Sequence, residues 1–276
     1  MQLVNYKIKT TYSSKFNYSV EFLAKKRIIL NAKNVLNYIK KAIKNHRNLL
    51  DIGSGFGYFL KESEKVFDYS LGLEPSVNLY SFSRKILKTN VKKQTFQKFF
   101  KTNKNRRFDV ITMIHVIEHV KDPESFILKA LGLLNRDGIL FIETPNLNSR
   151  LFEAEQKDYT FLTPPEHLFI FSIDSFKEIL NNINYVKIIK VSTYSYVEHS
   201  VKIINTFFKS FFNKNYSPSH IYNTPFVHDR GENVSIFKFR KYLFFVIFHR
   251  ILGPIILPFV KLGHKGTFLR LYIKKI

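Results

Sequence analysis

The stretch Asn48-Leu49-Leu50-Asp51-Ile52-Gly53-Ser54-Gly55-Phe56-Gly57-Tyr58-Phe59-Leu60 predicts a strand, a tight turn and a helix in direct succession. A short apolar run ends in an acid, three alternating glycines follow, and a helix-like pattern then begins. This order is typical of a buried parallel strand that leads into a helix. Glycine is needed where the backbone takes a positive φ or passes close to a ligand. The start of the new helix offers free N–H groups to an anionic group.

The spacing of the glycines separates two kinds of nucleotide-binding fold. A dinucleotide-binding turn reads G-x-G-x-x-G, and its third glycine would fall at Tyr58. The pattern found, Asp51-x-Gly53-x-Gly55-x-Gly57, instead resembles motif I of the class I S-adenosylmethionine (SAM) methyltransferases. The resemblance implies that the turn, with Ser54, packs against the methionine end of SAM and that Asp51 positions the SAM amino group. A nicotinamide-dependent oxidoreductase is disfavoured.

Two further stretches are expected to contact the nucleoside. Residues 69–74 predict a second strand, and Glu74 at its end can accept two hydrogen bonds from a ribose diol in either kind of fold. The alternative is an exposed acid that caps the helix starting at Pro75. Residues 91–96 predict a third strand, after which relatives often carry an acid; here Gln94 or Gln97 offers an amide oxygen instead.

Residues 108–120 predict a fourth buried strand that runs into a polar cluster, followed by a helix with Asp122 as N-cap and Pro123 at its first position. The run resembles the F-D-x-[IV]…H-V-[IL]-E-H-V-x-D-P segment of SAM methyltransferases. Ligands of open α/β sheets lie beyond the carboxyl ends of the strands, so His115 should face the methyl group or the acceptor. The cofactor-binding candidates are Asp51, Gly53, Ser54, Gly55, Gly57, Glu74, Pro75, Gln94 and His115.

The remaining pattern predicts the fold class. Residues 138–143 and 185–196 predict a fifth and a sixth strand, a helix begins at Ser172 or Asp174, and residues 267–273 resemble the family's closing antiparallel strand. The segments around residues 143–146 and 167–172 resemble the E-T-P-N…H-L-x-x-F-S pattern of one methyltransferase subgroup. We therefore expect an α/β, Rossmann-like, seven-stranded sheet, mostly parallel with an antiparallel closing strand, and helices on both faces.

The order of motifs predicts four segments. An N-terminal helical region (1–47) packs on the core, a SAM-binding core spans 48–196, an insertion or cap spans 197–262, and the closing strand of the core spans 263–276. Residues 197–235 are irregular and aromatic and are expected to set acceptor specificity.

Composition limits the function classes. Hydrophobic residues make up 45% of the 276 residues, which suffices for a core, and the absence of cysteine excludes disulfides, thiolate zinc sites and a cysteine nucleophile. The first 30 residues show no signal peptide. The net charge of +23 favours anionic partners such as nucleic acid or acidic lipid, with codon bias as the alternative reading. Lysine outnumbers arginine and no RNA-binding signature is present, which weakens the nucleic-acid interpretation.

The stretch from Lys238 onward contains no acid and mixes basic with apolar residues. Prolines and charges interrupt it, so it does not predict a spanning helix. It either lies on an anionic membrane surface or packs over the pocket or the N-terminal helices. We expect a cytoplasmic protein, or one that is peripheral at the inner membrane surface.

The chemistry expected at the site is O-methylation of a sugar, polysaccharide, lipid-linked or quinone-type hydroxyl. The protein would align the acceptor with the methyl group and exclude water, and His115, His119 and His167 are candidate bases. The alternatives are an RNA methyltransferase, motivated by charge, and an inactive SAM-fold binding module at a membrane.

A divalent metal is a further candidate. His115, Glu118 and His119 stand at i, i+3 and i+4, so a helical turn would place them on one face. The pattern resembles the E-x-x-E-H cluster of small-RNA terminal 2′-O-methyltransferases and of ubiquinone-pathway O-methyltransferases, and His167 stands where the RNA enzymes have a further histidine. The resemblance implies an ion that lowers the pKa of the acceptor hydroxyl; His115 in place of the first Glu favours a softer ion than Mg²⁺. Otherwise Glu118 pairs locally and His119 packs under the next helix.

Overall fold

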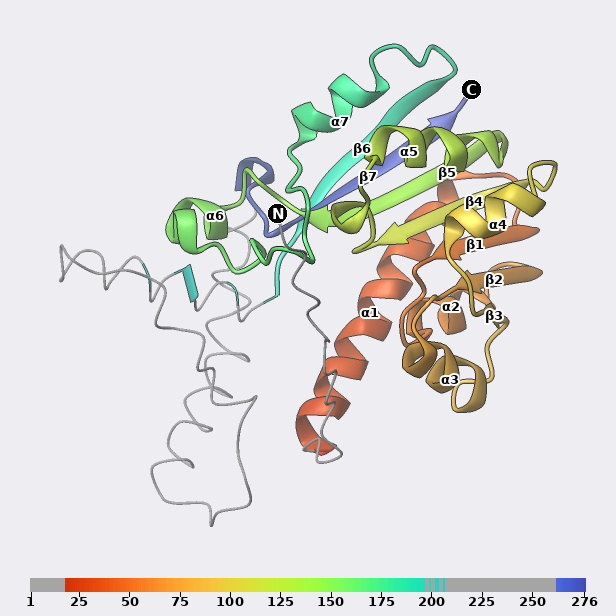
Figure 1. The fold of residues 1–276 in the computed structure, drawn as a ribbon, viewed down its shortest axis with the longest axis horizontal. Helices are drawn as coiled ribbons and strands as arrows, with labels where there is room; N and C mark the ends of the chain where they lie inside the picture. Colours follow the sequence, from red (N-terminus) through yellow and green to blue (C-terminus); the bar gives the residue numbers. More distant parts are fainter. Residues whose placement is uncertain (1–17, 197–198, 200–201, 204–205, 207–261) are drawn as a thin grey trace, which may run out of the picture.

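The computed structural model describes residues 18–196, 199, 202–203, 206 and 262–276 (Figure 1). Most of the predicted cap and of the basic-apolar stretch therefore lies outside the described residues, and its predicted membrane contact stays a prediction. Among the described helices, none is long and apolar enough to cross a membrane.

A seven-stranded sheet forms the centre of the fold, with the order β3-β2-β1-β4-β5-β7-β6. β7 runs antiparallel between β5 and β6, and the other described neighbours pair in parallel. This arrangement confirms the predicted fold class. The strands are β1 (Asn48–Ile52), β2 (Tyr69–Leu73), β3 (Val91–Lys92), β4 (Phe108–Ile114), β5 (Leu134–Pro145), β6 (Val186–Tyr194) and β7 (Phe268–Lys275).

Helices cover both faces of the sheet (Figure 1). They are α1 (Tyr18–Ala42), α2 (Tyr58–Ser63), α3 (Val77–Lys85), α4 (Phe96–Thr102), α5 (Pro123–Gly132), α6 (Arg150–Glu155) and α7 (Ile173–Leu180), with short 3-10 turns η1 (Ile117–His119), η2 (Gln156–Asp158) and η5 (Leu262–His264).

The alternation of side chains along each strand builds two core layers. Leu50 and Leu140 face a layer that contains side chains of α4, α5 and α7. Leu49 and Ile139, one position earlier in each strand, face the layer of α1 and α2. Both faces of the central strands are buried, and their sequences are therefore continuous apolar runs.

Local capping explains most helix starts. Asp122 accepts a hydrogen bond from Ser125 N at the start of α5, where Pro123 is the first residue, as predicted. Ser172, and not Asp174, caps α7, and its side chain exchanges hydrogen bonds with Ser175 in a capping box.

Two sequence predictions about strands were wrong. The third strand ends at Lys92 rather than at residue 96, because Thr95 accepts a hydrogen bond from Lys98 N and begins helix α4, which we did not predict. The fifth strand begins at Leu134 rather than at Gly138. Leu134 pairs with Phe108 and Ile139 with Val110, so the expected turn is an irregularity within the strand.

A buried ion pair connects α1 to the sheet. Arg270 of β7 donates from Nε to the Glu143 carboxylate of β5 and from its guanidinium to the Asn31 side chain of α1. Both charged residues are nearly inaccessible to solvent. Glu143 therefore depends on its partner, because an uncompensated buried charge is costly.

We expect Arg270→Ala to lower the free energy of unfolding by about 3 kcal/mol, because Glu143 then keeps a buried charge without its main counterion. Chemical denaturation followed by circular dichroism measures the change. The matched control is Lys274→Ala on the same strand, which removes an ion pair between a half-buried Lys274 and the exposed Asp137 and should change stability much less. Equal losses in the two variants would contradict the assignment.

Candidate functional site

The glycine turn lies at the carboxyl end of β1, and its three glycines differ in role. Gly53, Gly55 and Gly57 all take a positive φ. A Cβ at Gly53 would lie 2.5 Å from Val116 Cγ2, and one at Gly57 would lie 2.1 Å from Ser83 Oγ, whereas a Cβ at Gly55 would meet no described residue within 4 Å. Close packing thus requires Gly53 and Gly57, and Gly55 borders open space.

Glu74 holds this turn in place from the end of β2. Its carboxylate accepts hydrogen bonds from Gly55 N and Ser76 N, both at 2.8 Å. The sequence predicted a ribose contact for Glu74, and the structure adds a scaffolding role. Of the neighbouring candidates, Pro75 is exposed and Gln94 is half-buried, while the buried Ser54 Oγ has no hydrogen-bond partner among the residues that the structure describes.

Asp51 is buried directly behind the turn. Thr112 of β4 donates a hydrogen bond of 2.7 Å to its carboxylate. Burial raises the pKa of Asp51 to about 7; the Thr112 hydrogen bond lowers it and the nearby Glu74 charge raises it further. The carboxyl group is thus poised to ionise when a cation lies beside it.

His115 lies between two carboxylates at the end of β4. Its Nδ1 is 3.2 Å from Glu118 Oε1 and its Nε2 is 3.4 Å from Glu143 Oε1. Burial alone lowers the pKa of His115, but the hydrogen bonds and charges of Glu118 and Glu143 outweigh it and raise the pKa to about 9. The backbone takes a φ of 55° here, a conformation that non-glycine residues seldom adopt.

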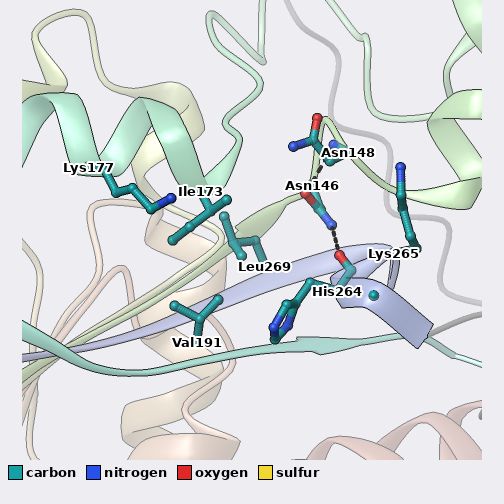
Figure 2. A pocket seen from close by; sticks show the side chains of 9 residues that line it. Asn146, Asn148, Ile173, Lys177, Val191, His264, Lys265 and Leu269 are labelled. Carbon is teal, nitrogen blue, oxygen red and sulfur yellow. Dashed lines mark hydrogen bonds between the residues drawn. The ribbon is translucent and has the colours of Figure 1, made fainter.

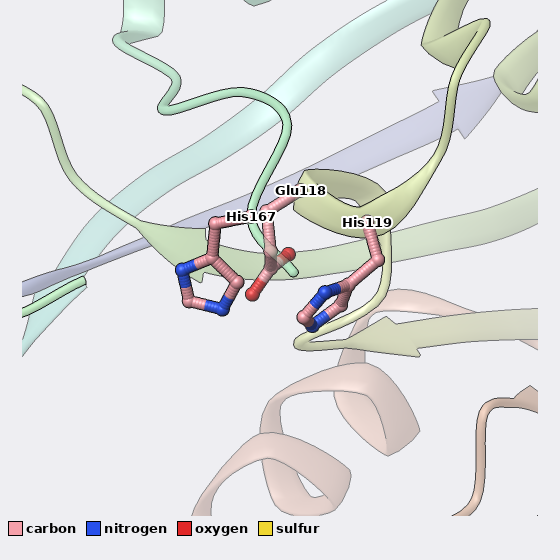
Figure 3. Close-up of side chains that lie close together, drawn as sticks. All are labelled: Glu118, His119 and His167. Atoms are coloured by element: carbon pink, nitrogen blue, oxygen red, sulfur yellow. The ribbon is translucent and has the colours of Figure 1, made fainter. Parts of the chain in front are cut away.

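Glu118, His119 and His167 form a separate cluster, whose ligand atoms all lie within 4.8 Å of one another. Figure 3 shows the Glu118 carboxylate between the two imidazole rings. His119 Nδ1 is 2.7 Å from the Glu166 carbonyl oxygen, and His167 Nδ1 is 2.5 Å from that of Phe161. If both Nδ1 atoms donate, each ring keeps an Nε2 lone pair, which is the arrangement of metal-binding histidines.

The predicted metal-ligand set is only partly brought together. Glu118, His119 and His167 converge, but His115 lies outside the cluster. The expected helical face fails because η1 begins at Ile117, after His115. Both ring nitrogens of His115 also face carboxylates, so neither presents the free lone pair that a metal needs. That His115 acts as a base stays a prediction. Because the two carboxylates favour its protonated form, His115 would first have to release a ring proton.

Three residues of the site were not assigned by the sequence analysis. Glu143 and Arg270 are described above, and Thr144 donates a hydrogen bond of 3.0 Å to Glu118 Oε2. Glu143 could have been found, since it is the only acid in an otherwise apolar strand end. Nothing in the local pattern places Arg270 beside it.

A pocket of about 370 Å³ lies on the α7 face of the sheet (Figure 2). Ile173, Val191 and Leu269 give it apolar walls, and Lys177 and Lys265 lie at its sides. Leu269 belongs to the core layer of α7, whereas its neighbours Phe268 and Arg270 point to the opposite face. None of the predicted catalytic or cofactor-binding residues lines this pocket.

Comparison with known proteins places this geometry in a family. The model of a methyltransferase-domain family matches residues 23–189. The ubiquinone biosynthesis O-methyltransferase of Glaesserella parasuis serovar 5 (strain SH0165) is 28% identical over 114 residues, which cover 38% of this chain and 48% of the relative. That of Coxiella burnetii (strain RSA 493 / Nine Mile phase I) is 28% identical over 137 residues, covering 48% and 58%. The chain thus spans about half the length of these curated relatives.

Solved structures share the fold at low identity. A SAM-dependent methyltransferase from Archaeoglobus fulgidus superposes with a TM-score of 0.57 at 17% identity and covers 91% of this chain and 94% of its own. The plantazolicin methyltransferase BpumL, in complex with SAH, gives a TM-score of 0.52 at 17% identity, covering 94% and 87%. The matched family model and the shared fold agree with the glycine turn and its acids: the chain belongs to the methyltransferase-domain family, among the class I SAM-dependent methyltransferases.

Proposed function

We propose that this chain transfers the methyl group of SAM to a hydroxyl group of a quinone-type acceptor. The observation that carries the methyl transfer is the open space at Gly55, in a turn with the buried carboxyls of Asp51 and Glu74 behind it. The relatives named as ubiquinone biosynthesis O-methyltransferases support oxygen as the methylated atom and a quinone-type compound as the acceptor.

The residues present fit SAM in shape and charge. Within the described part of the chain, the turn leaves room where a ligand approaches Gly55, and Ser54 Oγ is a buried polar atom that lacks a hydrogen-bond partner. Four acids are buried around the carboxyl ends of the strands: Asp51, Glu74, Glu118 and Glu143. Glu143 is already neutralised by Arg270 and His115, so Asp51 and Glu74 at the glycine turn are the acids that suit a ligand with an ammonium and a sulfonium group.

SAM supplies an activated methyl group, so the protein mainly has to align the two reactants and exclude water. Asp51 would hold the amino group and Glu74 the ribose, since the Glu74 oxygens have lone pairs beyond the two that accept from Gly55 and Ser76. His115 would then face the transferred group from the end of β4.

A divalent ion at Glu118, His119 and His167 is part of the proposal. Two imidazoles and one carboxylate form a recurring ligand set for divalent ions, and the backbone carbonyls that hold both Nδ1 atoms orient the free nitrogens. A bound ion would lower the pKa of an acceptor hydroxyl. Leu168 N, next to His167, donates a hydrogen bond of 2.8 Å to the backbone carbonyl oxygen of Glu118. This bond holds the segment that carries His167 against the turn that carries Glu118 and His119.

Gly55→Val should abolish binding of S-adenosylhomocysteine (SAH), the product of methyl transfer, because the branched side chain fills the open space at the turn. The positive φ adds about 1–2 kcal/mol of strain, which the fold should tolerate. Isothermal calorimetry measures binding and circular dichroism the fold. Gly132→Ala is the matched control, since a Cβ there also meets nothing within 4 Å but lies far along the chain at the end of α5. Wild-type affinity in Gly55→Val, or a preference for NADH, would overturn the proposal.

SAH affinity should depend on the ionisation of Asp51. The pKa of this group is raised to about 7 in the free protein, and the ligand ammonium requires the carboxylate. Binding should therefore weaken by up to about tenfold for each pH unit below pH 7. Calorimetry at several pH values measures this slope. The Asp51→Asn variant should bind SAH weakly, with an affinity that does not change with pH in this way. A wild-type affinity independent of pH between about 6 and 7.5 would contradict the role of Asp51.

His167→Ala should lower the affinity for Mn²⁺ and Zn²⁺, because it removes one of three converging ligands. Calorimetric titration of the purified protein with each metal measures the loss, and elemental analysis measures retained metal. His46→Ala is the control, since the His46 ring lies near the Lys40 carbonyl oxygen and Phe67 and is not part of the ligand cluster. Methyl transfer that survives exhaustive chelation, with no metal recovered, would remove the ion from the proposal.

A further inference from the structure

We infer that a cluster of rings beside His115 binds the quinone-type acceptor proposed above and that His199 hydrogen-bonds the hydroxyl group of this acceptor. The inference rests on the proposed methyl transfer and concerns a histidine that the sequence analysis did not single out. Phe161, Tyr196, His199 and Phe268 are called the aromatic cluster below.

Phe268 lies at the centre of the aromatic cluster. Its ring centroid is 5.3 Å from that of Phe161, 5.7 Å from Tyr196 and 5.5 Å from His199. Phe268 begins β7 and pairs with Pro145 at the end of β5 and with Tyr194 at the end of β6. The aromatic cluster therefore lies at the edge of the sheet where the parallel strands end, which is the edge that carries the candidate site.

The same rings contact the histidines of that site. The His115 ring meets Phe268 edge-to-face at a centroid distance of 4.7 Å. Phe161 lies 6.4 Å from the His167 ring with nearly parallel planes. An acceptor against the aromatic cluster would thus lie beside both the end of β4 and the proposed ion.

His199 carries an unmet hydrogen-bonding requirement. Within the described part of the chain, its buried Nδ1 atom has no hydrogen-bond partner. A buried nitrogen without a hydrogen-bond partner destabilises the folded chain and calls for an explanation. Burial lowers the pKa of His199 to about 3, and the charges of Lys202, Arg27 and His115 lower it further. The ring is therefore neutral at physiological pH, and a neutral imidazole can both donate to and accept from a hydroxyl group.

The surroundings favour an aromatic acceptor over a sugar. Every hydroxyl of a buried sugar ring needs a polar partner, and the aromatic cluster offers mainly ring faces and edges. A planar aromatic ring is instead stabilised by each favourable ring pair that it forms. The cations that keep His199 neutral would also lower the pKa of a phenolic hydroxyl group beside it.

The test uses the full chain with SAH bound and 3,4-dihydroxybenzoate as the probe. We expect wild type to bind the probe, His199→Phe to bind it at least about tenfold more weakly while keeping the ring packing, and His199→Gln to recover part of the loss. SAH affinity should be equal in all three proteins. His46→Phe is the matched control and should bind both ligands as wild type does. Ligand-observed NMR and calorimetry measure binding without relying on turnover.

Methyl α-glucoside is the comparison ligand that represents a sugar acceptor, and the SAH-bound protein should not bind it. Three outcomes would each overturn the inference and leave the methyltransferase proposal standing. The His199→Phe variant could bind the probe as tightly as wild type does, a wild-type protein that binds SAH could fail to bind the probe, or the glucoside could bind more tightly than the probe. A wild-type protein that binds no SAH would instead overturn the proposed function, and with it the inference that rests on it.

Discussion

The buried Glu143 carboxylate is the constraint on which the ligand edge of the molecule depends. It lies inside an apolar sheet, where an ionised group persists only if opposite charges neutralise it. Arg270 does so from β7 and His115 from the end of β4, and Asn31 of α1 completes the guanidinium's hydrogen bonds. Although burial alone would raise the pKa of Glu143, these two cations lower it to about 2. The charge of Glu143 on β5 thereby connects β7, the end of β4 and α1, which are far apart in the sequence.

The distribution of charge separates the site from the rest of the surface. The chain is strongly basic, yet the buried acids gather where the strands end. Glu74 shows why such acids serve structure as well as binding: its two oxygens accept from the backbone on either side of the ligand space, at Gly55 and Ser76. A change at Glu74 would therefore alter both the shape of the turn and its charge.

The histidines of the site fall into different electrostatic classes although they are close together. His115 is held as a cation by two carboxylates, while His119 and His167 are oriented by backbone carbonyl oxygens. His199 is kept neutral by burial and by nearby cations. A positioned cation, two candidate ligands and a neutral hydrogen-bonding ring are thus available within one site, and sequence spacing alone does not distinguish them.

The amino-acid sequence by itself determined the elements whose information is local. The Asp51–Gly57 turn, the acid that ends β2, the cap at Asp122 and the apolar runs of the central strands all follow from neighbouring residues. Together with the resemblance to SAM methyltransferases that they carry, they predicted the sheet and its cofactor. The prediction for residues 92–96 was wrong because the Thr95 cap starts a helix, which ends the strand early. Only the tertiary structure decided the pairing of Glu143 with Arg270, 127 residues apart, the exclusion of His115 from the His119–His167 cluster, and the position of His199 against Phe268. These depend on which strand ends meet at one edge of the sheet, and that proximity arises from the packing of distant segments rather than from any pattern along the chain.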